Sequence, residues 1–317
     1  MVDRSRIDAQ SRAPLDALLE FMPGGFNAIP DIVDRRATVA ALMAGQLEAA
    51  PPNPNVISED HAFEGPSGPL AARVYQPIGA LLPLPGLVFI HGGGMVLGSL
   101  DAEHLTAQMM CDELGIVVVS LDYRKAPEHP YPAGPEDCYA GLLWTAAHAS
   151  ELGVDPGNLG VYGGSAGGGL ALAVALMARD RGGPRLKYLM PIYPMIDDTN
   201  STASALEITD VGLWDLGANL ESWAMYLAGQ QADQYAAPAR ATDLSGLPPA
   251  YIDVGELDMF RDEDIEIARR LNAAGVPCEL HVYPGAYHGS EVFAPDADLS
   301  RRIIGNRLAA LRRFIDS

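Results

Sequence analysis

The chain has 317 residues, of which 48% are hydrophobic and 20% charged, a composition typical of a globular protein. Its 41 acidic residues against 21 Lys and Arg give a net charge of −20, which argues against binding to nucleic acids or anionic membranes. Cys111, Cys138 and Cys278 are widely spaced and form no C-x-x-C motif, so we expect neither disulfides nor a zinc site. We therefore expect the protein to be cytoplasmic.

The first fifty residues are expected to be helical. Apolar residues recur at helical spacing between 15 and 22, PGG interrupts the pattern, and a second helix is predicted at 32–49. The charged start lacks the apolar core of a signal peptide, and no apolar run approaches the roughly 20 residues of a membrane span. We interpret residues 1–52 as a helical cap segment; a helical pair that only covers one edge of the core is the alternative.

Beyond residue 53, short apolar strands alternate with helices. Strands are predicted as a hairpin at 56–75 and then at 86–90, 116–121, 159–162, 187–193, 251–254 and 279–283. Helices are predicted at 102–114, 136–149, 166–181, 262–274 and 299–315, and the four prolines of 122–135 predict a loop. This alternation predicts an α/β fold with a mainly parallel sheet and helices on both faces, built from residues 53–193 and 250–317.

Residues 194–249 interrupt the alternation. They contain Trp214 and Trp223, and a helix is predicted near 220–227. We interpret this segment as an insertion that contributes to the cap, and a long surface connection is the alternative.

A glycine-rich turn follows the strand predicted at 159–162. It reads GGSAG at 163–167 and leads directly into a helix, so the pattern G-x-S-x-G stands between a strand and a helix. This is the context of a nucleophile elbow, a tight turn that requires glycine at Gly163 and Gly167 and raises the serine hydroxyl above the sheet. Ser165 is therefore the candidate nucleophile, and a turn that only packs tightly is the alternative.

A serine nucleophile needs a base and an acid that orients the base. Among seven histidines, His288 is the best candidate base, because it follows the last predicted strand and precedes a glycine. Asp258 is the candidate acid, since it lies just past the strand at 251–254 and gives the chain order Ser, Asp, His. Glu256 is the second candidate for the acid, and we expect Asp262 to cap the next helix.

A second glycine run, HGGG at 91–94, follows the strand at 86–90. Backbone N–H groups of this loop, together with that of Ala166, are expected to form an oxyanion hole, each donor contributing roughly 3 kcal/mol in the transition state. His91 is expected to brace the loop. Taken alone, this run could also be a flexible loop without catalytic use.

Several motifs together resemble the bacterial hormone-sensitive-lipase-type (family IV) esterases of the α/β-hydrolase superfamily. They are HGGGMVLG, DYRKAPEHPYPA, GGSAGG, DMFRDE and the closing His-Gly pair. The resemblance runs from about residue 56 onward and implies an eight-stranded sheet, a helical cap, hydrolysis of short acyl esters without a cofactor, and frequent homodimers. The site residues that it implies are Ser165, Asp258 and His288 as the triad, with Gly93, Gly94 and Ala166 as the oxyanion hole.

The sequence departs from the family pattern at three places. Gly164 replaces the usual Asp or Thr, Ser290 replaces the usual Phe after the final His-Gly, and Met259-Phe260 replaces Pro-Leu after the acid. None of these changes removes a catalytic group, and Gly164 leaves the branch of the family open.

The sequence thus predicts a serine carboxylesterase whose partner is a small-molecule ester. The same triad could instead hydrolyse an amide, a lactone or an acetyl group, and a non-catalytic small-molecule binding protein on this fold is a third reading. The residues expected to line an apolar acyl pocket are Met95, Val96, Leu97, Trp214 and Tyr287.

Overall fold

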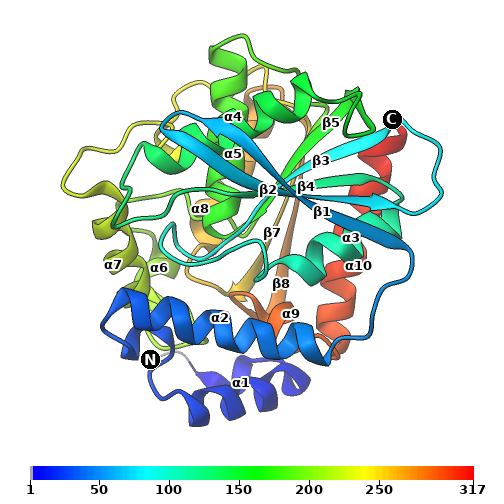
Figure 1. The fold of residues 1–317 in the computed structure, drawn as a ribbon. Coiled ribbons are helices and arrows are strands. Elements are labelled where there is room, and N and C mark those ends of the chain that lie inside the picture. The colour runs from blue at the N-terminus through cyan, green and yellow to red at the C-terminus, as the bar shows by residue number, and fades with distance from the viewer. Residues whose placement is uncertain (1–2) are drawn as a thin grey trace.

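Eight strands form one sheet, in the order β1-β2-β4-β3-β5-β6-β7-β8, in the computed structural model, which describes residues 3–317 (Figure 1). The strands are β1 (Val56–Gly65), β2 (Gly68–Pro77), β3 (Leu84–Ile90), β4 (Val117–Asp122), β5 (Val154–Gly164), β6 (Tyr188–Ile192), β7 (Ala250–Leu257) and β8 (Cys278–Tyr287). β2 pairs antiparallel with both β1 and β4, and the other neighbours pair parallel. The predicted fold class is therefore confirmed.

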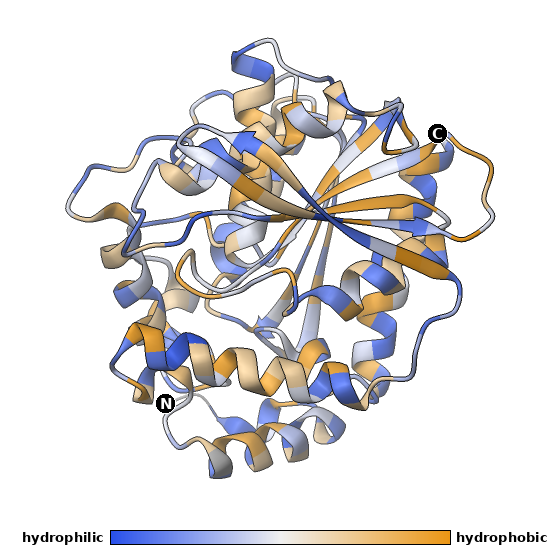
Figure 2. Ribbon diagram, in the orientation of Figure 1, coloured by the Kyte–Doolittle hydropathy of each residue, from blue (hydrophilic) through white to orange (hydrophobic). Residues whose placement is uncertain are grey.

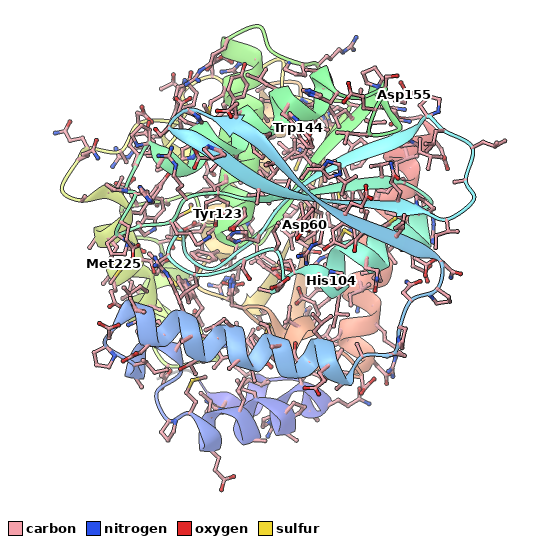
Figure 3. The ribbon with its side chains drawn as sticks, viewed as in Figure 1. Asp60, His104, Tyr123, Trp144, Asp155 and Met225 are labelled. Carbon is pink, nitrogen blue, oxygen red and sulfur yellow. The ribbon has the colours of Figure 1, made fainter. Side chains whose placement is uncertain are left out.

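Helices cover both faces of this sheet. One face carries α4 (Ala133–Ala147), α5 (Ala166–Asp180) and α8 (Arg261–Ala273), and the other carries α3 (His104–Leu114) and α10 (Asp298–Asp316). Along β3, Val88 and Ile90 belong to the core cluster that contains α4 and α5, whereas Leu87 and Phe89 belong to the cluster that contains α3 and α10. Because both faces are buried, most residues of the central strands β3 and β4 are hydrophobic (Figure 2). Side chains fill the layers between the sheet and the helices (Figure 3).

Two N-terminal helices lie at the end of the molecule toward which β7 and β8 point (Figure 1). They are α1 (Ala9–Phe21) and α2 (Ile32–Ala49), joined through the 3-10 helix η2 (Phe26–Ala28). Asp8 and Asp31 begin the two helices by accepting hydrogen bonds from backbone N–H groups of the first turn. α1 contacts the short helix α9 (Ser290–Phe293).

The segment 194–249 contains α6 (Ala203–Glu207), α7 (Leu216–Leu227) and the 3-10 helix η3 (Pro238–Arg240). Arg35 of α2 binds Glu221 of α7, with Nη1 2.8 Å from Oε2. The two segments that the sequence assigns to a cap are thus in direct contact.

Local structure differs from expectation at several element boundaries, two of which precede Ser165. The stretch 122–135 is not all loop, because α4 begins at Ala133 and includes Pro135 in its first turn, where the missing N–H of proline leaves no helical hydrogen bond unmade. β5 begins at Val154 rather than at 159.

Candidate active site

Ser165 lies on the turn between β5 and α5, with φ of 58° and ψ of −121°. A Cβ atom at Gly163 would lie 2.1 Å from the carbonyl oxygen of Gly167, and one at Gly167 would lie 2.1 Å from that of Ile90. Only glycine fits at both positions, which is the physical reason for the elbow pattern. The turn places the serine hydroxyl at the carboxyl edge of the sheet.

The three residues predicted as a triad meet at this edge. His288 Nε2 lies 3.0 Å from Ser165 Oγ, and His288 Nδ1 lies 2.7 Å from Asp258 Oδ2. Because an ionised carboxylate only accepts hydrogen bonds, Nδ1 carries the proton that faces Asp258, and Nε2 remains the acceptor for the serine hydroxyl. Asp258 is fully buried and Ser165 is 8% exposed. This arrangement can pass a proton from the serine to the imidazole.

Asp258, and not Glu256, is the acid that contacts His288. The second oxygen of Asp258, Oδ1, accepts the Phe260 N–H at 3.0 Å, which fixes the carboxylate plane. Glu256 instead accepts the N–H of Gly285 at 3.0 Å and pairs with the guanidinium of Arg6. That guanidinium and the Gly285 N–H lower the pKa of Glu256.

Asp262 does not cap α8, contrary to expectation. It is the second residue of the helix, whose N-cap position is Phe260. The Asp262 carboxylate accepts the Ser204 N–H at 2.8 Å, and Ser204 Oγ accepts the Asp262 N–H at 3.0 Å. A residue of the 194–249 segment thus satisfies the helix N-terminus, a long-range contact that local sequence patterns do not reveal.

The glycine loop after β3 is built around a buried histidine. Gly93 and Gly94 have φ of 109° and 62°, a region that favours glycine. His91 Nδ1 lies 2.8 Å from the Gly92 carbonyl oxygen, and the His91 ring stacks on Tyr123, labelled in Figure 3, with ring centroids 4.2 Å apart. Burial lowers the pKa of His91, so a neutral imidazole supports the loop from within.

Glu103, directly before α3, lines the cavity together with Gly92 and Gly93 of this loop and was not among the predicted site residues. Burial raises the pKa of Glu103 to about 7, although hydrogen bonds with Thr106 and with the Gly92 backbone act in the opposite direction. The N–H groups of Gly93, Gly94 and Ala166 stay the candidates for an oxyanion hole.

A mainly apolar cavity of about 970 Å³ opens at the serine and histidine of the triad. Among the residues predicted for an acyl pocket, Leu97 and Trp214 line this cavity. Met95, Val96 and Tyr287 lie outside its lining and are at most 3% exposed, because they pack into the core instead. Apolar residues of α2 complete the wall, so this N-terminal helix shapes the space next to Ser165.

No metal site accompanies this cavity in the part of the chain that the structure describes: within residues 3–317, no three His, Cys, Asp or Glu side chains gather so as to hold a metal ion. His104, labelled in Figure 3, lies at the start of α3 with Nδ1 3.0 Å from the Tyr75 hydroxyl, away from the triad. Across the same residues, no helix is both long enough and apolar enough to cross a bilayer.

Comparison with known proteins places the chain in a family. Residues 87–292 match the model of a family described by its alpha/beta hydrolase fold. The chain belongs to this family. Carboxylesterase NlhH of Mycobacterium tuberculosis is 37% identical over 310 residues, which are 95% of this chain and 95% of that protein. Esterase LipI of the same organism is 37% identical over 272 residues, 84% of this chain and 85% of that protein.

Solved structures agree with the sequence relatives. A bacterial heroin esterase superposes with a TM-score of 0.92 at 37% identity and covers 99% of both chains. An esterase of the archaeon Pyrobaculum calidifontis superposes with a TM-score of 0.89 at 34% identity, over 97% of this chain and 98% of the other. The resemblance to hormone-sensitive-lipase-type esterases, inferred from the motifs, is confirmed.

Proposed function

We propose that this carboxylic ester hydrolase cleaves short-chain acyl esters through an acyl-enzyme on Ser165. The observation that carries the proposal is the unbroken hydrogen-bonded series from Ser165 Oγ through His288 to Asp258, with separations of 3.0 and 2.7 Å. The series opens onto a mainly apolar cavity that suits an acyl chain. The names of the sequence relatives, esterase and carboxylesterase, support the same class of bond.

The chemistry follows from these positions. His288 Nε2 takes the proton of Ser165 as Oγ bonds to the ester carbonyl carbon, and Asp258 stabilises the imidazolium that forms. The N–H groups of Gly93, Gly94 and Ala166 would donate to the oxyanion. The imidazolium then protonates the leaving alcohol as the C–O bond breaks. Water, deprotonated by the same imidazole, attacks the acyl-enzyme and releases the acid and the free serine.

Turnover of p-nitrophenyl butyrate tests this proposal. We expect the wild-type enzyme to release p-nitrophenol and Ser165→Ala to lose at least about 10⁴-fold in kcat, because only the residual stabilisation by binding and oxyanion donors remains. A variant that retains full activity would refute Ser165 as the nucleophile.

Two other functions of this site can be distinguished from ester hydrolysis by experiment. Amide, lactone or acetyl-group hydrolysis would use the same groups, and a panel of these substrates at equal concentration separates them from simple esters. A purely binding role is disfavoured by the contact between Ser165 and His288. An active-site-directed fluorophosphonate would fail to label a binding protein.

The cellular location and the oligomeric state are predicted from the sequence alone. We propose a cytoplasmic homodimer, as the composition and the family resemblance suggest. The cysteines at 111, 138 and 278 are free thiols, which suits a reducing compartment. Light scattering tests the assembly, since a dimer has twice the mass of one chain.

A further inference from the structure

His288 is held by two aromatic rings that the reaction itself does not use. The Tyr193 ring meets the imidazole edge to face, with centroids 4.7 Å apart and an interplanar angle of 65°. The Phe260 ring meets it at 5.1 Å and 81°. Phe260 is fully buried and cannot give way without disturbing the core. The orientation of the imidazole therefore depends on where these two rings are held.

Tyr193 is fixed at both ends. It follows β6 directly, and its backbone N–H donates to the carbonyl oxygen of Asp253 at 2.8 Å. Its φ of 32° is an unfavourable conformation for a bulky residue and persists only where the surroundings enforce it. Its hydroxyl donates to Glu291 Oε1 at 2.7 Å.

A buried ionic network supports this tyrosine. Arg307 donates to both oxygens of Asp253, at 2.7 and 2.8 Å, and to Glu291 Oε1 at 2.6 Å. The three side chains are at most 6% exposed, and the guanidinium lies 5.1 Å from the centroid of the Tyr193 ring. Burial alone would raise the pKa of Glu291, but Arg307 and the Tyr193 hydroxyl outweigh it and hold that pKa below its ordinary value. Glu291 therefore carries a negative charge, and Tyr193 is bonded to Glu291 through its hydroxyl and to Asp253 through its backbone N–H.

The network joins the elements on either side of the base. Asp253 belongs to β7, which precedes Asp258, and Glu291 lies in α9, three residues after His288. Arg307 comes from α10. Because a buried charge that loses its partner is strongly unfavourable, these contacts hold β7, α9 and α10 in one arrangement.

We propose that Tyr193, held by Glu291 and Arg307, is a positioning residue that keeps the His288 imidazole aimed at Ser165. This inference rests on the proposed hydrolysis through Ser165. An imidazole that turned away from the serine would press against Tyr193 on one side or Phe260 on the other. Since small misplacements of a catalytic group cost large factors in rate, the tether acts on kcat more than on substrate binding.

Tyr193→Phe tests the tether, with Tyr251→Phe as its matched control. The Tyr251 hydroxyl is also buried and lies 3.2 Å from Asp253 Oδ2, but its ring contacts His281 and not the base. With p-nitrophenyl butyrate, we expect Tyr193→Phe to lower kcat roughly tenfold with KM within about twofold, and Tyr251→Phe to change kcat by less than about twofold. A kcat for Tyr193→Phe within twofold of wild type, or an equal loss in both variants, overturns the proposal.

A second pair of variants covers the case in which Tyr193→Phe does not fold. Glu291→Gln keeps an oxygen that accepts from the Tyr193 hydroxyl, whereas Glu291→Leu removes it. We expect the Gln variant to retain a higher kcat than the Leu variant when both unfold at similar temperatures, and equal kcat values contradict the proposal. A wild-type enzyme without any turnover refutes the hydrolysis itself, whereas wild-type turnover with an unaffected Tyr193→Phe refutes only the positioning role.

Discussion

Two helices next to Ser165, α5 and α2, are held in place by different kinds of contact. Along α5, which begins at the serine, every residue from Ala166 to Ala178 is buried. Along α2, all of whose residues the structure describes, Arg35 alone is buried, and the other contacts are half-exposed apolar side chains and ion pairs. Residues of α2 line the cavity, whereas α5 begins beside it at Ser165, so one side of the site belongs to the core and the other is docked against it.

The difference indicates a division of labour between the two regions. A helix buried on all sides cannot move without opening cavities, which cost several kcal/mol for each large side chain lost, so the sheet edge keeps the reacting atoms in register. A helix held by a few polar contacts can shift at smaller cost. We therefore expect changes near the sheet edge to abolish catalysis, and changes in the N-terminal helices to alter substrate binding.

The largest effect should come from the buried acid at the sheet edge. We expect Asp258→Asn to lower kcat about 10³- to 10⁴-fold, because an amide no longer stabilises the imidazolium or fixes its tautomer. Glu256→Gln, two residues away and without contact to His288, is the matched control and should stay within about threefold. Steady-state kinetics with p-nitrophenyl butyrate measures both, and similar losses in the two variants would reopen the assignment of the acid.

A smaller effect is expected where α2 docks. Arg35 donates to Ile29 O at 3.0 Å and to both oxygens of Glu221, which is 34% exposed. We expect Arg35→Ala to lower the free energy of unfolding by about 2 kcal/mol. We also expect it to raise KM more than it lowers kcat, because α2 lines the cavity. The control is Arg4→Ala, which breaks the exposed pair with Asp16 and should change the free energy of unfolding by about 0.5 kcal/mol or less. Urea unfolding and kinetics measure these effects. A kcat loss in Arg35→Ala as large as that of Asp258→Asn would contradict the division of labour.

The smallest effect on catalysis is expected at Glu103, which lines the cavity. Its pKa is raised from 4.5 to about 7 by burial, so its contribution to stability is fully present below about pH 4.5 and is lost as the pH rises through 7. Glu103→Gln cannot titrate. We expect its free energy of unfolding, relative to wild type, to rise by roughly 2 kcal/mol between pH 5 and pH 8. Denaturant unfolding at both pH values measures this difference, and a constant difference would show that Glu103 is ionised throughout.

Local patterns were enough to predict the sheet, α2 and the meeting of Ser165, His288 and Asp258. The bounds 32–49 of α2 match the prediction, since its periodicity and the Asp31 cap are properties of neighbouring residues. Ser165, His288 and Asp258 each follow a strand, and the parallel topology brings strand ends together whatever their separation in sequence. The G-x-S-x-G pattern and the chain order Ser, Asp, His were therefore enough to predict which residues meet.

The surroundings of the triad could not be predicted in the same way. Tyr193 and Glu291 are 98 residues apart and meet only through tertiary packing, so no local signal connects them. Met95 and Val96 are apolar neighbours of the glycine loop, but whether such side chains face the core or the cavity depends on packing that the sequence does not display. At Gly164 an added Cβ would lie 3.4 Å from Tyr193, an ordinary contact, so steric need does not explain that glycine.

Covalent labelling of the serine tests the central claim most directly. A fluorophosphonate is added to the wild-type enzyme, Ser165→Ala and His288→Ala, and the modified peptide is mapped by mass spectrometry. We expect one adduct, on Ser165, that forms rapidly in wild type and is absent in Ser165→Ala. In His288→Ala, where no base takes the serine proton, we expect it to form at least about 10³-fold more slowly. An adduct on another residue, or equal labelling rates with and without His288, would contradict it.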